Sequence, residues 1–315
     1  MTWKNFPNLY RQGHISFLTM PDGINLRTAS WPSEDDSRGI VVLVNGHREY
    51  MEKYSELISD FLKRGFAVYA LDNRGQGLSD RLLPNRYKSH SENFDAFSND
   101  LNEFISRIVM LDPRSGEIPI YLVGHSMGGH ICLRYLHDFP GTIDKSVVMA
   151  PMIEFSLGGR LVSAAIKLTL RLASRIGFGK KFAFGQGYGF FSRERHLIRQ
   201  KLLTHDDKRY AVEVDIIEAM PDLYAGGATF GWLRRALDSI DKIRADGFLE
   251  EISIPVMVVL AGADRIVDSA TSHAYFSGHD NFSLVTIEGA RHEIYREADQ
   301  YRDQLWREID NFLET

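Results

Sequence analysis

The sequence predicts an α/β protein with a mostly parallel, eight-stranded sheet, helices on both faces and an inserted helical segment. Three observations support this fold class. Short apolar runs bounded by turn residues alternate with longer segments whose apolar residues recur at helical intervals. The middle runs are almost continuously hydrophobic, as in parallel strands covered on both faces, and the first two runs indicate an antiparallel hairpin. Between residues 151 and 241 the strand pattern disappears.

The expected strands are β-rich apolar runs that end at turn residues. In chain order they are Gly13–Leu18, Ile24–Ser30, Ile40–Val44, Ala67–Leu71, Ile118–Val123, Ser146–Met149, Pro255–Leu260 and Phe282–Ile287. The expected helices carry apolar residues at spacings of three and four. They are Tyr54–Arg64, Phe94–Met110, Met127–Asp138 and Ala298–Leu313.

The break in this alternation predicts two structural units. Residues 1–150 and 242–315 are expected to form the core, and residues 151–241 a helical insertion that sits on the sheet. Within the insertion, Arg160–Ile176 is expected to be an amphipathic helix with apolar residues opposite a basic arc, which consists of Arg160, Lys167, Arg171 and Arg175. Two interpretations remain open: a helix that packs on the core with its charges in solvent, or an interfacial helix drawn to anionic lipid.

Composition and charge exclude several classes of protein. The 315 residues include 37 basic and 42 acidic side chains, and the net charge of −5 disfavours a nucleic acid as the main partner. The single cysteine, Cys132, can form neither an internal disulfide nor a thiolate zinc cluster. The first residues lack a secretory signal pattern, and no run reaches the roughly 18–20 apolar residues of a spanning helix. A cytoplasmic protein is expected, with at most peripheral membrane contact.

The strongest local motif is Gly124-His125-Ser126-Met127-Gly128, which matches G-x-S-x-G. It lies directly between an expected strand and an expected helix, where a nucleophile elbow belongs. In such an elbow the flanking glycines allow a strained, closely packed turn that lifts the serine hydroxyl above the sheet edge. Ser126 is therefore the candidate nucleophile. His125, although adjacent, is expected to pack, because a neighbour in the elbow would point away from the hydroxyl.

A serine nucleophile needs a histidine base and a carboxylate that orients it. Asp264 follows the strand at Pro255–Leu260, and His292 follows the strand at Phe282–Ile287. The order Ser, Asp, His is that of α/β-hydrolases. Asp268 is close enough to compete for the acid role, but Asp264 is favoured because it directly follows the glycine turn at the strand end.

The same chemistry requires two backbone amides that stabilise an oxyanion. The residue after the nucleophile, Met127, is one candidate, and His47 in the turn after the third strand is the other. No second histidine follows His292-Glu293 at the spacing of a zinc site, and no glycine-rich loop matches a nucleotide fingerprint. No cofactor or metal is therefore expected.

Several stretches together resemble the serine hydrolases of the α/β-hydrolase fold, and within them bacterial lysophospholipases and monoacylglycerol lipases. These stretches are NGHREYMEKY, LDNRGQGLSDR, GHSMGG, GGATFGWL, AGADRIVD and GARHEIYRE, spread from about residue 40 to the C-terminus. The resemblance implies that residues 151–241 cap an acyl pocket. It also implies hydrolysis of a single-chain lipid ester through an acyl-enzyme.

Two other functions remain open from the sequence. A peptidase or amidase of this fold would want an acidic cluster in the insertion to hold an amine, and Glu194, Glu213 and Glu218 are scattered. A non-catalytic binding protein on a hydrolase scaffold usually has a broken triad, whereas this one is complete. Oligomeric state, acyl length and head group do not follow from the sequence.

Overall fold

The computed structural model describes residues 12–32, 37–155, 160–188 and 199–314, with the side chains of residues 160–164 left out. Eight strands form one sheet in the order β1-β2-β4-β3-β5-β6-β7-β8. The strands are β1 (His14–Thr19), β2 (Asn25–Trp31), β3 (Gly39–Val44), β4 (Phe66–Leu71), β5 (Ile120–His125), β6 (Lys145–Met149), β7 (Val256–Ala261) and β8 (Phe282–Ile287). The β1–β2 and β2–β4 pairs are antiparallel, and the other pairs are parallel. The predicted fold class is confirmed, and each predicted strand is present within two residues of its expected bounds.

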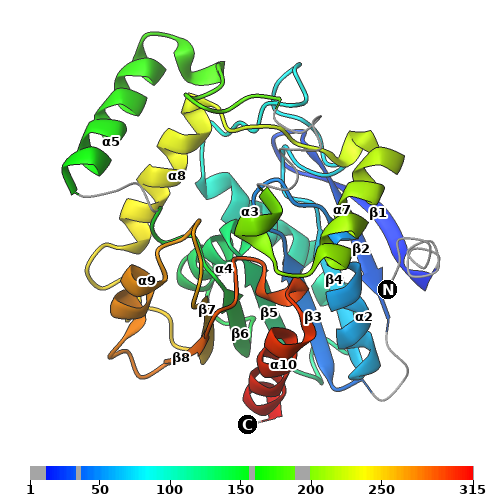
Figure 1. The fold of residues 1–315 in the computed structure, drawn as a ribbon. Helices are drawn as coiled ribbons and strands as arrows, with labels where there is room; N and C mark the ends of the chain where they lie inside the picture. The colour runs from blue at the N-terminus through cyan, green and yellow to red at the C-terminus, as the bar shows by residue number, and fades with distance from the viewer. Residues whose placement is uncertain (1–11, 33–36, 156–159, 189–198, 315) are drawn as a thin grey trace.

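Helices cover both faces of the sheet (Figure 1). They are α2 (Ser55–Lys63), α3 (Asp95–Arg107), α4 (Met127–Asp138), α5 (Arg160–Arg175), α7 (Asp207–Ala219), α8 (Phe230–Ile243), α9 (Ser269–Phe276) and α10 (Asp299–Glu314). Short 3-10 turns are η2 (Met51–Tyr54), η3 (Val109–Leu111), η4 (Phe178–Lys180), η5 (Pro221–Leu223) and η6 (Ile294–Arg296). The helix α9 was not predicted, because it is short and has no amphipathic stripe that would reveal it in the sequence.

Alternate side chains of the buried strands point to opposite faces and build two apolar layers. On one face, Val42 and Val44 pack with residues of α3, α4, α8 and α9. On the other face, Val41 and Leu43 pack with residues of α2 and α10. Each of these β3 side chains is at most 1% exposed. The sheet is therefore packed between helices on both faces. The loops that follow the carboxyl ends of its strands can place functional groups next to one another.

Between β6 and β7 the described residues form helices and short turns, without a further strand of the sheet. The helices α5 and α8 of this segment lie side by side (Figure 1). The second half of α8 reaches the main core, where Ala236, Ile240 and Ile243 are at most 1% exposed. In the described residues, no helix combines the length and the apolar character needed to cross a membrane.

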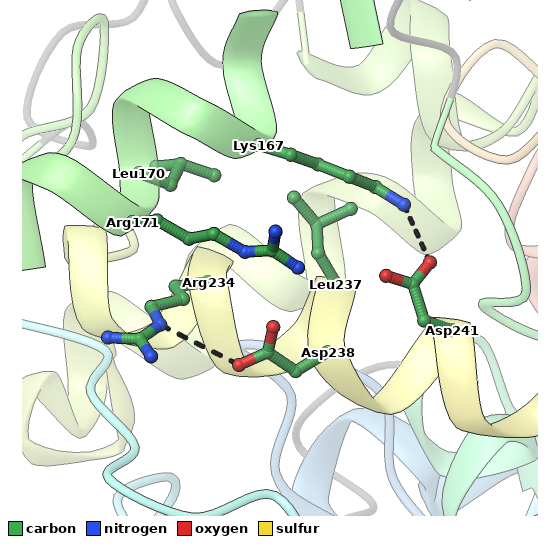
Figure 2. Close-up of a pocket in the computed structure, with 7 residues that line it drawn as sticks. All are labelled: Lys167, Leu170, Arg171, Arg234, Leu237, Asp238 and Asp241. Carbon is green, nitrogen blue, oxygen red and sulfur yellow. Dashed lines mark hydrogen bonds and ion pairs between the residues drawn. The ribbon is translucent and has the colours of Figure 1, made fainter. Parts of the chain in front are cut away.

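The helix α5 corrects one sequence expectation. Lys167 forms an ion pair with Asp241 of α8 at 2.6 Å instead of pointing freely into solvent, as Figure 2 shows. Of the apolar arc, Leu170 is buried, but Leu168, Leu172 and Ile176 are 59%, 50% and 70% exposed. Because the helix rests on α8 along the edge between its two faces, part of its apolar face stays uncovered. The side chain of Arg160 lies outside the described residues.

Candidate active site

Ser126 occupies the tight turn between β5 and α4. Its backbone is left-handed, with φ 55° and ψ −116°, a conformation that costs a non-glycine residue free energy and is typical of a functional constraint. Glycine is required on both sides of the turn: a Cβ on Gly128 would lie 2.0 Å from the carbonyl oxygen of Val44, and one on Gly124 would lie 2.5 Å from Cys132 Sγ. The motif therefore folds as the sequence predicts, with the hydroxyl at the carboxyl edge of the sheet.

Three sequence-predicted residues meet at this edge. Asp264 Oδ2 lies 2.7 Å from His292 Nδ1, and His292 Nε2 lies 3.0 Å from Ser126 Oγ. Because a carboxylate only accepts, Nδ1 carries the proton and Nε2 is left to accept the hydrogen bond of the serine hydroxyl. The Asp264 and His292 side chains are 0% and 4% exposed, whereas Ser126 is only partly buried. This arrangement is the hydrogen-bonded chain that activates a serine nucleophile.

The pKa shifts in this chain have a common cause. Burial alone would lower the pKa of His292, but the charge and hydrogen bond of Asp264 outweigh it and raise that pKa above its ordinary value. Burial alone would raise the pKa of Asp264, but His292 and the backbone N–H groups of Ile266 and Val267 hold it below its ordinary value. The acid therefore stays ionised and the imidazole is made more basic.

The competing residues have other partners. The carboxylate of Asp268 caps α9 by accepting the N–H of Thr271 at 2.9 Å. His125 is buried, and its Nε2 donates to the carbonyl oxygen of His292 at 3.0 Å. Its imidazole thus lies behind the catalytic loop and helps to hold that loop in place, a contact that the sequence analysis reduced to packing.

The two backbone amides expected to bind an oxyanion belong to Met127 and His47. Met127 is the first residue of α4, and His47 follows β3. Within the described residues neither backbone N–H donates to a protein oxygen, so both are open to a ligand. The His47 ring stacks on Trp232 of α8, with the ring centroids 3.9 Å apart. A residue of the segment between β6 and β7 therefore packs directly on the oxyanion loop.

A buried acid, Glu49, fixes that loop, and the sequence analysis did not assign it a role. Its Oε2 accepts the N–H of Gly46 at 2.7 Å and the hydroxyl of Tyr54, and it lies 3.2 Å from His125 Nδ1. Lys53 Nζ lies 3.0 Å from Glu49 Oε1. Burial alone would raise the pKa of Glu49, but Lys53 and His125 hold it well below its usual range. The oxyanion loop and the His292 loop thus share one buried support.

An apolar cavity of about 520 Å³ lies in the segment between β6 and β7. Its lining includes Phe155, Ile166, Leu170, Phe184, Phe230 and Leu233. Phe155 forms an isolated antiparallel bridge with Val267, whose N–H donates to Asp264 at 3.1 Å. The cavity wall is therefore connected to the loop that carries the candidate acid, and its size is typical of a small-molecule site.

Of the acidic residues that a peptidase would need, the two in the described part of the chain do not form an open cluster. Glu213 is buried and neutralised by Lys53, Arg199 and Arg296. Glu218 is exposed on α7. Glu194 lies outside the described residues.

Comparisons with known proteins agree with this geometry. The model of the serine aminopeptidase S33 family matches residues 35–299. The chain is 30% identical over 282 residues to a probable lysophospholipase L2 from Haemophilus influenzae, covering 89% of this chain and 85% of the relative. It is 29% identical to lysophospholipase L2 from Escherichia coli, in an alignment that covers 97% of this chain and 89% of the relative. A crystal structure of a soluble variant of monoglyceride lipase from Saccharomyces cerevisiae superposes with a TM-score of 0.76 at 20% identity. The superposition covers 95% of this chain and 94% of that one.

Proposed function

This chain belongs to the serine aminopeptidase S33 family and is a serine hydrolase, and we propose that it hydrolyses single-chain lipid esters, either lysophospholipids or monoacylglycerols. The observation that carries the proposal is the continuous hydrogen-bonded chain from Ser126 through His292 to Asp264. The relatives named lysophospholipase and monoglyceride lipase support the substrate class. The apolar cavity supports an acyl chain as the buried part of the substrate.

In the proposed mechanism, His292 takes the proton of Ser126 as the hydroxyl oxygen attacks the ester carbonyl carbon. The resulting oxyanion accepts hydrogen bonds from the backbone amides of His47 and Met127. The imidazolium, stabilised by Asp264, then protonates the departing alcohol. Water then enters, loses a proton to the same imidazole and attacks the acyl carbon. The bond between that carbon and Ser126 Oγ breaks as the imidazolium returns the proton to Oγ, and the fatty acid leaves.

We infer that residues 151–241 serve as a cap and that this cap meets lipid. Stacking of Trp232 on His47 supports a position over the site. The exposed side chains of Leu168, Leu172 and Ile176 recur at four-residue spacing, so they share one face of α5 and its continuation. Such an apolar stripe is suited to insert at the headgroup boundary of a membrane. The protein would then bind the membrane surface peripherally and take up one lipid chain from it.

The experiment that tests the function is the Ser126→Ala variant. It should lower kcat/KM on lysophosphatidylcholine and monoacylglycerol by more than about 1000-fold while leaving the thermal midpoint nearly unchanged. Ser106→Ala, which removes an exposed hydroxyl on α3, is the matched control and should change neither quantity. Wild-type protein that cleaves aminoacyl p-nitroanilides but neither lipid would refute the substrate class. Retention of a tenth of the activity in Ser126→Ala would refute the nucleophile.

A further inference from the structure

The residue after His47 in the oxyanion loop is an arginine in an unfavourable backbone conformation. Arg48 has φ 63°, in the left-handed region that disfavours long side chains. Glycine would adopt this conformation without the cost. Retention of an arginine at such a position points to a task for its side chain, because strained residues persist where the surroundings and the function require them.

The described contacts of the Arg48 guanidinium are all with neutral groups: two oxygens and the ring of Tyr224, whose centroid lies 5.6 Å from the guanidinium carbon. Its Nε donates to the carbonyl of Ala225 at 3.0 Å, and Nη2 donates to the hydroxyl of Tyr224 at 2.7 Å. Among the described residues, no carboxylate lies within ion-pair distance of it. The side chain is partly buried. A partly buried cation with no counter-ion is unfavourable, so the protein presents a charge that an anionic ligand would neutralise.

Among the described residues, the charges around Arg48 leave it as the excess cation. Three carboxylates of the neighbouring cluster, Glu49, Glu213 and Glu293, are bound by three cations, namely Lys53, Arg199 and Arg296. Arg199 keeps 21% of its side chain exposed. Burial, and then the positive charge of Arg199, lower the pKa of Arg48. The two arginines therefore lie close enough to repel, and Glu213, which pairs with Arg199, only partly offsets this effect on Arg48.

This cation is placed beside the reaction and under the cap. Arg48 directly follows His47, whose amide is assigned to the oxyanion. Its contacts, Tyr224 and Ala225, belong to the segment that leads into α8, and Trp232 of that helix stacks on His47. In a bound ester, the short glycerol backbone connects the head group to the ester carbonyl. A long side chain that starts at the oxyanion loop can therefore reach the head group.

We propose that Arg48, with Arg199 beside it, binds the phosphate of the substrate head group and makes this site a lysophospholipid site in preference to a monoacylglycerol site. The inference rests on the proposed lipid-ester hydrolysis and decides what that proposal leaves open. A lysophospholipid carries a phosphodiester anion on its glycerol, whereas a monoacylglycerol carries a neutral hydroxyl there. Only the lysophospholipid supplies negatively charged oxygens, which can accept hydrogen bonds from the Arg48 guanidinium and neutralise its charge.

The test compares two esters with the same acyl chain, decanoyl lysophosphatidylcholine and monodecanoylglycerol, both as monomers so that no lipid surface is involved. Arg48→Gln should lower kcat/KM on the lysophospholipid by about 10- to 100-fold and on the monoacylglycerol by less than about threefold. Arg48→Lys should keep part of the difference. Arg107→Gln removes the same charge from an exposed position on α3 and should leave both values unchanged.

A second measurement does not depend on lipid turnover. Glycerophosphocholine should inhibit p-nitrophenyl butyrate hydrolysis by the wild type competitively, and Arg48→Gln should abolish that inhibition. The inference is overturned if both lipids lose activity equally in Arg48→Gln, which would show a structural role, or if glycerophosphocholine inhibits both proteins alike. Equal inhibition by inorganic phosphate would overturn the head-group assignment. A wild type that cleaves neither lipid but hydrolyses p-nitrophenyl butyrate would instead refute the proposed function.

Discussion

Removing the exposed stripe of α5 should weaken binding to membranes by about two orders of magnitude. The change is the triple variant Leu168→Ser, Leu172→Ser, Ile176→Ser. These side chains are 59%, 50% and 70% exposed, so together they offer the area of nearly two complete aliphatic side chains. At about 1.5 kcal/mol for each aliphatic side chain fully removed from water, the low end of the usual range, their insertion is worth about 3 kcal/mol, or roughly 100-fold in a partition coefficient.

The assay is co-sedimentation with vesicles, run with zwitterionic and with anionic lipid. Leu111→Ser is the matched control, because Leu111 in η3 is 75% exposed but lies outside the cap. Turnover of a soluble short-chain ester should be unchanged in both variants, since none of the four positions contacts the triad. Arg171 and Arg175 are exposed on the same helix, so binding to anionic vesicles should also fall as salt screens their charge.

Three results would contradict this reasoning. Equal binding of the triple variant and the wild type would show that the stripe does not meet lipid. An equal loss in Leu111→Ser would show that the effect reflects general surface hydrophobicity instead of a defined membrane face. A drop in soluble ester turnover would mean that the stripe supports the fold of the cap.

The other predictions concern the catalytic chain. Asp264→Asn should lower kcat by about 10,000-fold, because the amide cannot hold the required tautomer of His292. Asp268→Asn should lower kcat by less than about tenfold, because asparagine caps a helix as well as aspartate does. Similar losses in both variants would contradict the assignment of Asp264 as the acid. The rate at which a fluorophosphonate labels Ser126 needs neutral His292, whose pKa is raised. It should therefore fall as the pH drops through a midpoint above about 6.5, and this midpoint should move lower in Asp264→Asn, where the raising charge is gone. An unchanged midpoint in that variant would show that Asp264 does not set the basicity of His292.

The regular part of the fold could be predicted because its signals are local. A buried parallel strand such as β3 or β7 is a continuous apolar run bounded by turn residues, so it can be recognised from the sequence alone. The helix α5 shows where this reasoning ends. Its periodicity gives the two faces of the helix correctly, but which face α8 covers depends on Lys167 meeting Asp241, a pairing of residues 74 positions apart in the sequence. Periodicity contains no information about such a partner.

The candidate site divides in the same way. Ser126, Asp264 and His292 could be found because each follows a strand, and parallel strands bring their carboxyl ends to one edge. Glu49 and Lys53 could not, because a glutamate and a lysine in a polar turn are ordinarily solvated. Their role depends on burial, which only the packed structure shows: Lys53 is 5% exposed and Glu49 is 3% exposed.

Buried charges connect α7 to the oxyanion loop and to the loop that carries His292. Lys53 of η2 forms ion pairs with Glu49 of the oxyanion loop, Glu213 of α7 and Glu293, which follows His292. Removing any one partner would leave an uncompensated charge in a dry environment, which typically costs about 3–5 kcal/mol. The same contacts would contribute little on the surface. A movement of α7 would break the ion pair between Glu213 and Lys53. Because Lys53 also holds Glu49 and Glu293, the position of α7 is energetically linked to the alignment of the oxyanion loop and the His292 loop.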